Sequence, residues 1–413
     1  MDHNLDDVER QMEFVSAVTR QRESRAAIEH LIGRVIDRLG GGVDPNLVVL
    51  FATREHLRAI DRVAAEVRAA WPQAVLMGAT AQGLLHPSCS YAAHPALALF
   101  AASLPGVPLA PVRLGLEDFE QAPLGLEKWQ AMLEVVPDPQ LILMLADPFT
   151  APASEIVDAL SIVAPRVPIA GGMASGAKRP GQHVLLLNDR QHRSGAVAVG
   201  LGGNLSAEIL VSQGYAPIGE PFEVTKAEGN VLLELDGQPA LEVLQEMVST
   251  LPSDTKNLLR GGLMLGEALR DPNGFGRGSF LVRPVVGVDQ EDGAIAVAGL
   301  VDEGRTVRFQ VWDDTLADDL EMLLLPQVAA PRAAGGLVFA SWPREGPLPK
   351  AGLSVTRLQK SLGYALPIGG MVTAGEIGPI QGVNYVHTHT ASLTLLRPAT
   401  APAREPQRPT PSE

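Results

Sequence analysis

The chain has 413 residues, of which 33 are Lys or Arg and 47 are Asp or Glu, and its formal net charge is −14. Because so acidic a surface repels phosphate backbones and anionic lipids, the charge argues against a nucleic-acid partner and against a membrane-surface protein. Hydrophobic residues make up 46% of the chain, which is enough for packed cores, and the length allows about two to four domains. The single cysteine, Cys89, excludes an internal disulfide and cysteine-rich metal centres.

The first residues and one long uncharged segment bear on localisation. Residues 1–14 are acidic and polar, unlike the basic and then apolar start of an export signal. Residues 69–112 contain no Lys, Arg, Asp or Glu, but six prolines interrupt them, so this segment predicts buried strands and not a spanning helix. We therefore expect a cytoplasmic protein with no membrane insertion.

Hydrophobic spacing predicts the first elements in chain order. Residues 14–18 favour a short strand, and residues 24–39 carry an apolar stripe with helical spacing that ends at three glycines. Residues 47–51 are continuously apolar, which is typical of a strand covered on both faces. A second amphipathic helix is predicted over residues 54–70.

The same arrangement then recurs three times. A strand, a helix and a second apolar strand lead to a Gly-x4-Gly segment of small residues, and another strand of small apolar residues follows. A crossover through a helix makes its two strands parallel, and the glycine turn then reverses the chain, so the repeats predict mixed sheets. The three glycine segments are residues 78–83, 171–176 and 370–375, and the strands that follow them are residues 95–102, 194–200 and 391–396.

We therefore expect an α/β fold of two domains with mixed β-sheets flanked by helices, built from repeated strand–helix–strand–glycine turn–strand units. The turn-rich residues 214–221 mark the joint, which places the domains at residues 14–221 and 222–397. Asp236-Gly237 predicts a tight turn between two strands. The Pro-rich tail, residues 398–413, is expected to be disordered.

The glycine segments are candidate ligand sites, because glycine lets a ligand approach bare backbone N–H groups. Neither a phosphate loop nor a Gly-x-Gly-x-x-Gly motif is present. One such turn is explained equally well by a tight hairpin, whereas three copies favour a shared pocket. The candidate ligand-binding residues in these segments are Gly78, Thr80, Gly83, Gly171, Gly172, Ser175, Gly176, Gly370, Thr373 and Gly375.

The segment from residue 369 to 396 is the richest in polar candidates. Glu376 stands among glycines and apolar residues, and His387 and His389 flank Thr388 on a predicted strand. Strand alternation places both imidazoles on one face of the sheet. With Glu376 they are candidates for a metal site of the facial-triad type, for haem iron or for a ligand carboxylate. The commoner alternative is a polar strand face with satisfied histidines.

The sequence contains no clear catalytic motif. The Gly-x-Ser-x-Gly elbow of hydrolases is absent, and Cys89 has only His86 and His94 near it in sequence, whereas triad partners are rarely sequence neighbours. We therefore assign no catalytic residue and expect a protein that is not an enzyme.

Several ordered segments resemble FIST proteins over roughly residues 14–396. Residues 214–222, 224–230 and 235–240 resemble the junction between the two domains of that family; residues 280–283, 286–289, 375–379, Asn384 and 387–391 resemble its second half; and residues 171–176 with 194–197 resemble its N-terminal domain. Glu376, Asn384 and His389 keep the family pattern. Residues 78–80, Tyr215 and residues 340–346 stand where family members often have cysteine or cysteine-containing segments, which disfavours thiol chemistry.

The resemblance implies a bacterial, intracellular sensory module with FIST N and FIST C domains that binds a small ligand such as an amino acid. Family members are often fused to kinases, cyclases or chemoreceptor parts, so a chain occupied by the two domains is expected to signal through a separate partner protein. Glu376 would bind a ligand ammonium, while Asn384 and His387 or His389 would bind its other end. Two alternatives stay open: a metal- or haem-dependent sensor that uses His387, His389 and Glu376, and an adaptor that acts only through protein contacts, as in an F-box relative.

Overall fold

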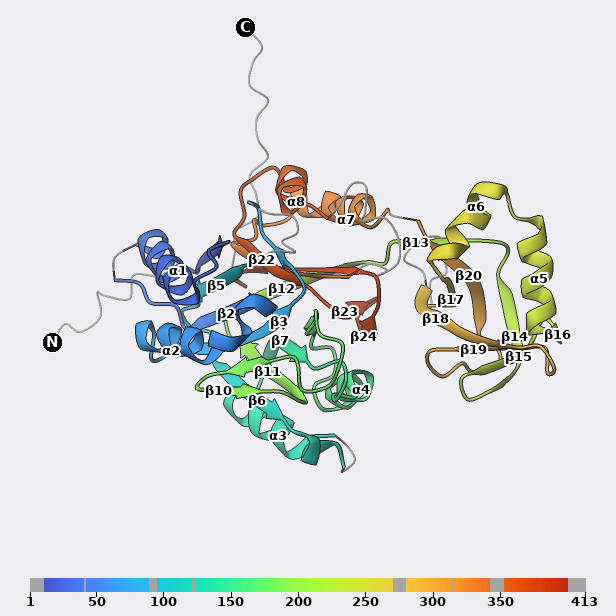
Figure 1. Cartoon of the computed structure of the whole chain (residues 1–413), viewed down its shortest axis with the longest axis horizontal. Coiled ribbons are helices and arrows are strands. Elements are labelled where there is room, and N and C mark those ends of the chain that lie inside the picture. The colour runs from blue at the N-terminus through green and yellow to red at the C-terminus, as the bar shows by residue number, and fades with distance from the viewer. Residues whose placement is uncertain are drawn as a thin grey trace, which may run out of the picture.

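Three α/β units and a β-barrel make up the molecule, and the barrel stands beside the body that the units form (Figure 1). The computed structural model describes residues 11–40, 42–88, 95–120, 124–269, 280–313, 315–341 and 353–399. Cys89, His94, residues 342–346 and the expected disordered tail beyond residue 399 lie outside the described residues.

Unit 1 is a six-stranded sheet in the order β1-β5-β2-β3-β9-β10, with α1 and α2 packed on its outer face. Helix α1 begins where the Glu23 carboxylate accepts hydrogen bonds from two backbone N–H groups, and it ends at Gly40, whose φ is 73°. The predicted second helix is present but opens as a 3₁₀ helix. The elements are β1 (Glu13–Thr19), α1 (Ser24–Leu39), β2 (Leu47–Thr53), η1 (Arg54–Ala59), α2 (Ile60–Ala70), β3 (Val75–Ala81), β5 (Leu97–Ser103), β9 (Leu185–Leu187) and β10 (Arg190–His192).

Units 2 and 3 repeat this plan, with sheets in the order β6-β11-β7-β8-β23-β24 and β12-β25-β21-β22-β4. Unit 2 contains β6 (Leu109–Leu114), η2 (Leu116–Phe119), α3 (Leu126–Val135), β7 (Pro139–Ala146), α4 (Ala153–Val163), β8 (Ile169–Met173), β11 (Ala196–Gly202), β23 (Glu376–Ile380) and β24 (Val383–His387). Unit 3 contains β4 (Leu84–Leu85), β12 (Ser206–Ser212), α7 (Leu316–Leu324), η4 (Leu325–Val328), β21 (Gly335–Ala340), α8 (Val355–Leu362), β22 (Ile368–Val372) and β25 (Ala391–Arg397).

The pairing of strands confirms the predicted mixed sheets. The two strands joined by a helix are parallel in each unit: β2 with β3, β7 with β8, and β21 with β22. The strand of small apolar residues that follows each glycine segment returns antiparallel to the first of them, as β5, β11 and β25. Three repeats that are visible in the sequence are therefore three equivalent units in the fold.

The units exchange strands in a cycle. After its glycine segment, unit 1 sends β4 to pair with β22 of unit 3. Unit 2 sends β9 to β3 of unit 1, and unit 3 sends β23 to β8 of unit 2. Each glycine segment is therefore the point where the chain leaves one sheet for the next, so the three segments lie together.

The inner faces of the three sheets share one central core. Phe51 of unit 1 meets Phe339 of unit 3 edge to face, with ring centroids 6.1 Å apart, and Leu143 of unit 2 belongs to the same cluster. A gap at its centre, between Met77, Leu143 and Phe339, is too small for a water molecule. Each sheet covers its outer face with its own helices.

The barrel consists of antiparallel strands that close on themselves, because β20 pairs with both β14 and β17. Asp236 and Gly237 have φ values of 49° and 77°, which confirms the predicted tight turn. The elements are β13 (Tyr215–Pro217), β14 (Phe222–Glu228), β15 (Val231–Leu235), β16 (Gln238–Pro239), α5 (Ala240–Thr250), α6 (Ser253–Leu258), η3 (Leu259–Gly261), β17 (Leu263–Ala268), β18 (Phe280–Asp289), β19 (Ala294–Val297) and β20 (Thr306–Trp312).

Sheets of the body draw on segments from both sides of residue 221, where the sequence places its domain boundary. Strand β12 pairs with β25, and β8 pairs with β23.

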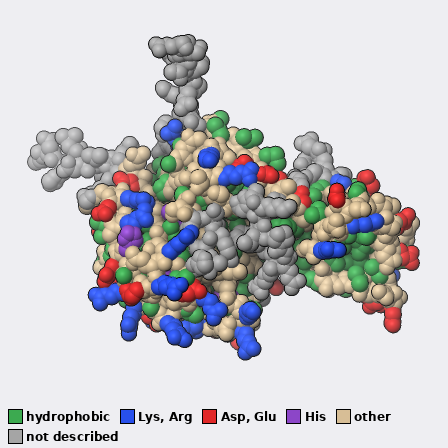
Figure 2. All heavy atoms as spheres, turned by 45° about the horizontal axis from the view of Figure 1, so that its top comes forward, with side chains coloured by type: hydrophobic (Ala, Val, Ile, Leu, Met, Phe, Trp, Pro, Cys, Tyr) green, Lys and Arg blue, Asp and Glu red, His purple; other side chains and the backbone are tan. Residues whose placement is uncertain are grey.

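On the face in Figure 2, Lys and Arg gather along the lower left edge of the body, whereas Asp and Glu gather at the outer end of the barrel. Within the described residues, no helix has the length and apolar character needed to cross a membrane.

Candidate functional site

The three glycine segments touch one another directly. The Ser175 N–H donates to the Thr80 carbonyl at 3.1 Å, the Val372 N–H to the Gly83 carbonyl at 2.9 Å, and the Met173 N–H to the Gly375 carbonyl at 2.8 Å. The Ser175 hydroxyl joins all three, since it accepts from the Gln82 N–H and donates to the Val372 carbonyl. The three glycine segments therefore lie in contact, as predicted, and their backbone N–H and C=O groups are hydrogen-bonded to one another at these contacts.

The first glycine of each segment lies inside a strand, which corrects the expectation that it belongs to a turn. A Cβ at any of the three would overlap a carbonyl oxygen on the neighbouring parallel strand. These glycines therefore permit close packing of two strands. The pairs are Gly78 with Leu50, Gly171 with Met144, and Gly370 with Val338. Two later glycines also face protein atoms, Gly172 against Thr373 and Gly176 against Gln82.

Glu376, on β23, is completely buried, and its carboxylate is the centre of a hydrogen-bond network. The hydroxyls of Thr373 and Ser341 donate to it, as do the hydroxyl and the N–H of Thr390, at 2.6 and 3.2 Å. The Ser341 hydroxyl in turn accepts from the His389 N–H at 2.9 Å. Glu376 thus ties the loop at residues 388–390 to the third glycine segment.

Burial raises the pKa of Glu376 from 4.5 to about 7, and the hydrogen bonds from Thr373, Thr390 and Ser341 only partly oppose that rise. The pKa of the neighbouring Tyr215 hydroxyl is also raised, first by burial and then by the charge of Glu376. The Glu376 carboxylate is therefore near its titration midpoint at neutral pH.

The two histidines do not share a face, because the strand ends between them. His387 is the last residue of β24 and donates its Nε2–H to the Gly378 carbonyl at 2.9 Å. His389 lies in a turn with a φ of 53°, which breaks the strand alternation on which the expectation rested. Burial lowers the pKa of both imidazoles to about 4. Among the described residues, no group of three or more His, Cys, Asp or Glu could hold a metal ion, so the alternative site of His387, His389 and Glu376 is not assembled.

Asn384 lies three residues before His387 on β24, opposite Pro379. Its Oδ1 accepts from the Ile169 N–H and its Nδ2 donates to the Val167 carbonyl, both at 2.9 Å. Both hydrogen bonds of the Asn384 amide therefore fix the backbone at the start of β8, which gives Asn384 a structural role.

Several buried polar atoms without a partner belong to the segments through which the barrel contacts the body, and we call this place the junction. Tyr215 pairs with Trp312 in the barrel sheet and donates its hydroxyl to the Thr388 carbonyl of the body at 3.0 Å. Among the described residues, the unpartnered buried atoms here are Gln213 Nε2, Gln310 Nε2, Trp312 Nε1 and His389 Nδ1. Native proteins leave few such atoms, so this group needs an explanation.

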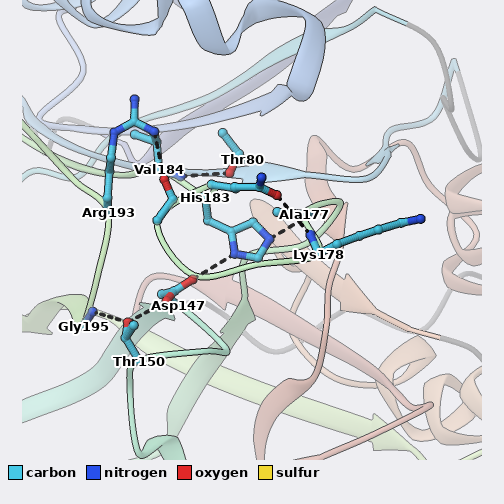
Figure 3. Close-up of polar contacts among 11 residues, drawn as sticks. Thr80, Asp147, Thr150, Ala177, Lys178, His183, Val184, Arg193 and Gly195 are labelled. Atoms are coloured by element: carbon cyan, nitrogen blue, oxygen red, sulfur yellow. Dashed lines mark hydrogen bonds and ion pairs between the residues drawn. The ribbon is translucent and has the colours of Figure 1, made fainter.

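A second buried network, in unit 2, has no signal in the sequence analysis (Figure 3). His183 donates its Nδ1–H to Asp147 Oδ1 at 2.8 Å, and its Nε2 accepts from the Ala177 N–H at 3.2 Å. Thr150 donates its hydroxyl to the other oxygen of Asp147 and accepts from the Gly195 N–H at 2.9 Å. Both nitrogens of His183 are thus used within the protein, so this pair fixes the loop at residues 177–184 and leaves no nitrogen for a substrate proton.

Asp147 could have been singled out, since it is the first residue after the apolar strand β7, where α/β proteins often place site residues. The equivalent residues of the other units are Thr53 and Ser341. Each donates its backbone N–H to a carbonyl oxygen across its own sheet. The Thr53 N–H donates to Ala96 at 3.0 Å, the Asp147 N–H to Gly195 at 2.9 Å, and the Ser341 N–H to Thr390 at 3.0 Å. The threefold repeat therefore extends to one polar residue per unit.

Comparison with known proteins agrees with the features of the fold and the sequence. The model of the FIST N domain matches residues 46–238, and that of the FIST C domain matches residues 240–379. The chain belongs to the FIST family. FIST domains are associated with sensory signal transduction and with the binding of small ligands.

Relatives share most of the chain. An uncharacterized protein of Mycobacterium tuberculosis is 34% identical over 391 residues, which cover 92% of this chain and 98% of the relative. An uncharacterized protein of Mycobacterium bovis is 34% identical over 384 residues, covering 91% and 96%. Among solved structures, a cyanuric acid hydrolase aligns with a TM-score of 0.36 and 8% identity over 94% of this chain and 100% of that one. The hydrolase from A. caulinodans gives 0.34 and 10% over 93% and 99%. These low scores have no bearing on function.

Proposed function

We propose that this FIST protein binds a small polar metabolite, with an amino acid as the first candidate, at the junction, and that it signals through a separate partner protein. The observation that carries the proposal is the group of unpartnered buried atoms at the junction. Three of them, Gln213 Nε2, Gln310 Nε2 and Trp312 Nε1, are N–H donors. A buried donor without a partner costs about 1–3 kcal/mol, which a ligand carboxylate would recover.

A buried carboxylate lies close to these donors. Glu376, the sequence's candidate for a ligand ammonium, is close enough to Tyr215 for its charge to raise the pKa of that hydroxyl, but it is fully buried with both oxygens hydrogen-bonded, so a ligand would act on it indirectly. His389, whose Nδ1 is also buried without a partner, belongs to the loop that Glu376 holds through Ser341 and Thr390. A ligand that engages His389 would therefore act on the network of Glu376, which supports a sensor and not a catalyst.

Thermal unfolding in the presence of each amino acid tests the proposal. A ligand at 100 times its Kd stabilises the fold by about 2.7 kcal/mol, which shifts Tm by a few degrees. Trp312→Phe keeps the aromatic ring and removes the indole N–H, so the affinity of a positive ligand should fall about tenfold. Trp71→Phe, in unit 1, is the matched control and should leave the affinity unchanged.

Two results would contradict the proposal. The first is that no amino acid and no related polar metabolite raises Tm. The second is that a ligand binds, but Trp312→Phe binds it as tightly as the unchanged protein does.

A further inference from the structure

A groove of about 610 Å³ lies between units 1 and 3, away from the junction. Its walls are the edge strand β1 and helix α1 of unit 1, the segment after β4, and the end of α8 with the residues that follow it. The volume lies within the range of about 300–1,000 Å³ that is usual for small-molecule sites. The lining residues are Phe14, Val15, Ser16, Arg34, Arg38, His86, Pro87, Ser88, Gln359, Ala365, Leu366 and Pro367.

The charge of this groove is opposite to that of the protein. No acidic residue is among its lining residues, although the chain has a net charge of −14. Arg34 and Arg38 stand four residues apart on α1, where like charges repel one another. Within the described part of the chain, no acidic side chain pairs with either of them. An anion between the two guanidinium groups would remove this repulsion.

The polar groups of the groove are held in place. Arg38 donates to the Ser16 carbonyl at 3.1 Å, and His86 Nε2 lies 3.3 Å from the same oxygen. His86 Nδ1 accepts from the Ser88 N–H at 3.1 Å. Burial lowers the pKa of His86 to about 4, and the charges of Arg34 and Arg38 add to this, so His86 is neutral at pH 7 and both guanidinium groups act on it.

The remaining walls are apolar, namely Phe14, Val15, Pro87, Leu366 and Pro367. The groove thus combines a positive side, formed by α1, with an apolar side. We propose that it is a second binding site, separate from the junction, for a small ligand that carries a phosphate or carboxylate group on an apolar body. The guanidinium groups would bind the anion, and the apolar wall would cover the rest of the ligand.

The fluorescent probe 8-anilinonaphthalene-1-sulfonate, an anion on an aromatic body, tests this site in the full chain. We expect the unchanged protein to bind it, with an affinity that falls as salt rises. Arg34→Gln should weaken binding about tenfold, since charge-assisted hydrogen bonds are lost. Ala365→Trp should abolish binding by filling the groove. Arg62→Gln on α2, an exposed arginine outside the groove, is the control and should change nothing.

Competition identifies the anion. Displacement of the probe by inorganic phosphate supports a phosphate ligand, and displacement by citrate supports a carboxylate. The proposal is overturned if neither anion displaces the probe, if Arg34→Gln and Ala365→Trp bind it normally while folded, or if Arg62→Gln weakens binding equally. Trp312→Phe should leave probe binding intact, so failure here is distinct from failure at the junction.

Discussion

Glu376→Gln tests whether the buried carboxylate that directly follows the third glycine segment takes up a proton in the fold. Burial raises its pKa from 4.5 to about 7. Between these values the folded protein holds a proton that the unfolded chain has released. The stabilisation is therefore complete below pH 4.5 and is lost as pH rises through about 7. A rise of this size corresponds to roughly 3 kcal/mol.

Glutamine reproduces the protonated form at every pH. Its amide oxygen can accept from the Thr390 N–H and hydroxyl in place of Glu376 Oε2, and its NH₂ can donate to the Thr373 hydroxyl oxygen in place of Oε1. We therefore expect Glu376→Gln to exceed the unchanged protein in free energy of unfolding by less than about 1 kcal/mol at about pH 5. At about pH 8.5 it should be more stable by up to roughly 3 kcal/mol.

Urea unfolding from pH 5 to 8.5 measures this, and only the difference between the two proteins is informative. Burial lowers the pKa of three histidines to about 4, namely His86, His387 and His389. The stability that they contribute is therefore lost as pH falls from 6.5, whereas the stability contributed by Glu376 is lost as pH rises. Glu66→Gln, an exposed carboxylate on α2, is the control. A difference between Glu376→Gln and the unchanged protein that stays constant with pH would refute the reasoning.

Two further substitutions test the packing of the repeats and the network of unit 2, each by urea unfolding. Gly171→Ala places a Cβ against the Met144 carbonyl at a φ of 151° and should lower the free energy of unfolding by several kcal/mol. The control Gly33→Ala, in open space on α1, should raise it by about 0.5–1 kcal/mol. Equal effects of the two substitutions would contradict the close packing of β7 and β8. Asp147→Ala leaves the His183 N–H without an acceptor and should cost about 2–3 kcal/mol, whereas Asp189→Ala, which breaks an exposed ion pair with Arg68, should cost less than about 1 kcal/mol; similar losses would show that the buried pair adds nothing.

The elements of the repeats are predictable because their signals are local. The apolar stripe over α1 and the continuous apolar run of β2 are set by side-chain spacing within a few residues, and both match the structure closely. The direction of each strand pair follows from the length of the crossover between them. The exchange of β4, β9 and β23 between units is not predictable in this way, because periodicity does not specify which sheet edge a hairpin joins.

The errors at the site have equally physical causes. The expectation for His387 and His389 assumed a continuous strand, but the chain turns at His389 with a positive φ, so the alternation of side chains stops there. Asp147 and His183 are 36 residues apart and meet only because β9 crosses into the sheet of unit 1. A pair that depends on strand exchange leaves no trace in sequence spacing.

Strand exchange also explains why the two regions of the family occur in one chain. In unit 2, β8 lies within residues 46–238, and the strand that pairs with its free edge, β23, begins at Glu376 in the second region. In unit 3, β22 lies in the second region and is paired by β4 of the first. Either region alone would expose unpaired N–H and C=O groups on β8 or β22, together with part of the shared core. The body is therefore one folding unit that contains both regions, and the barrel also draws on both, since β14 and β15 lie within residues 46–238 and β17 to β20 lie within residues 240–379.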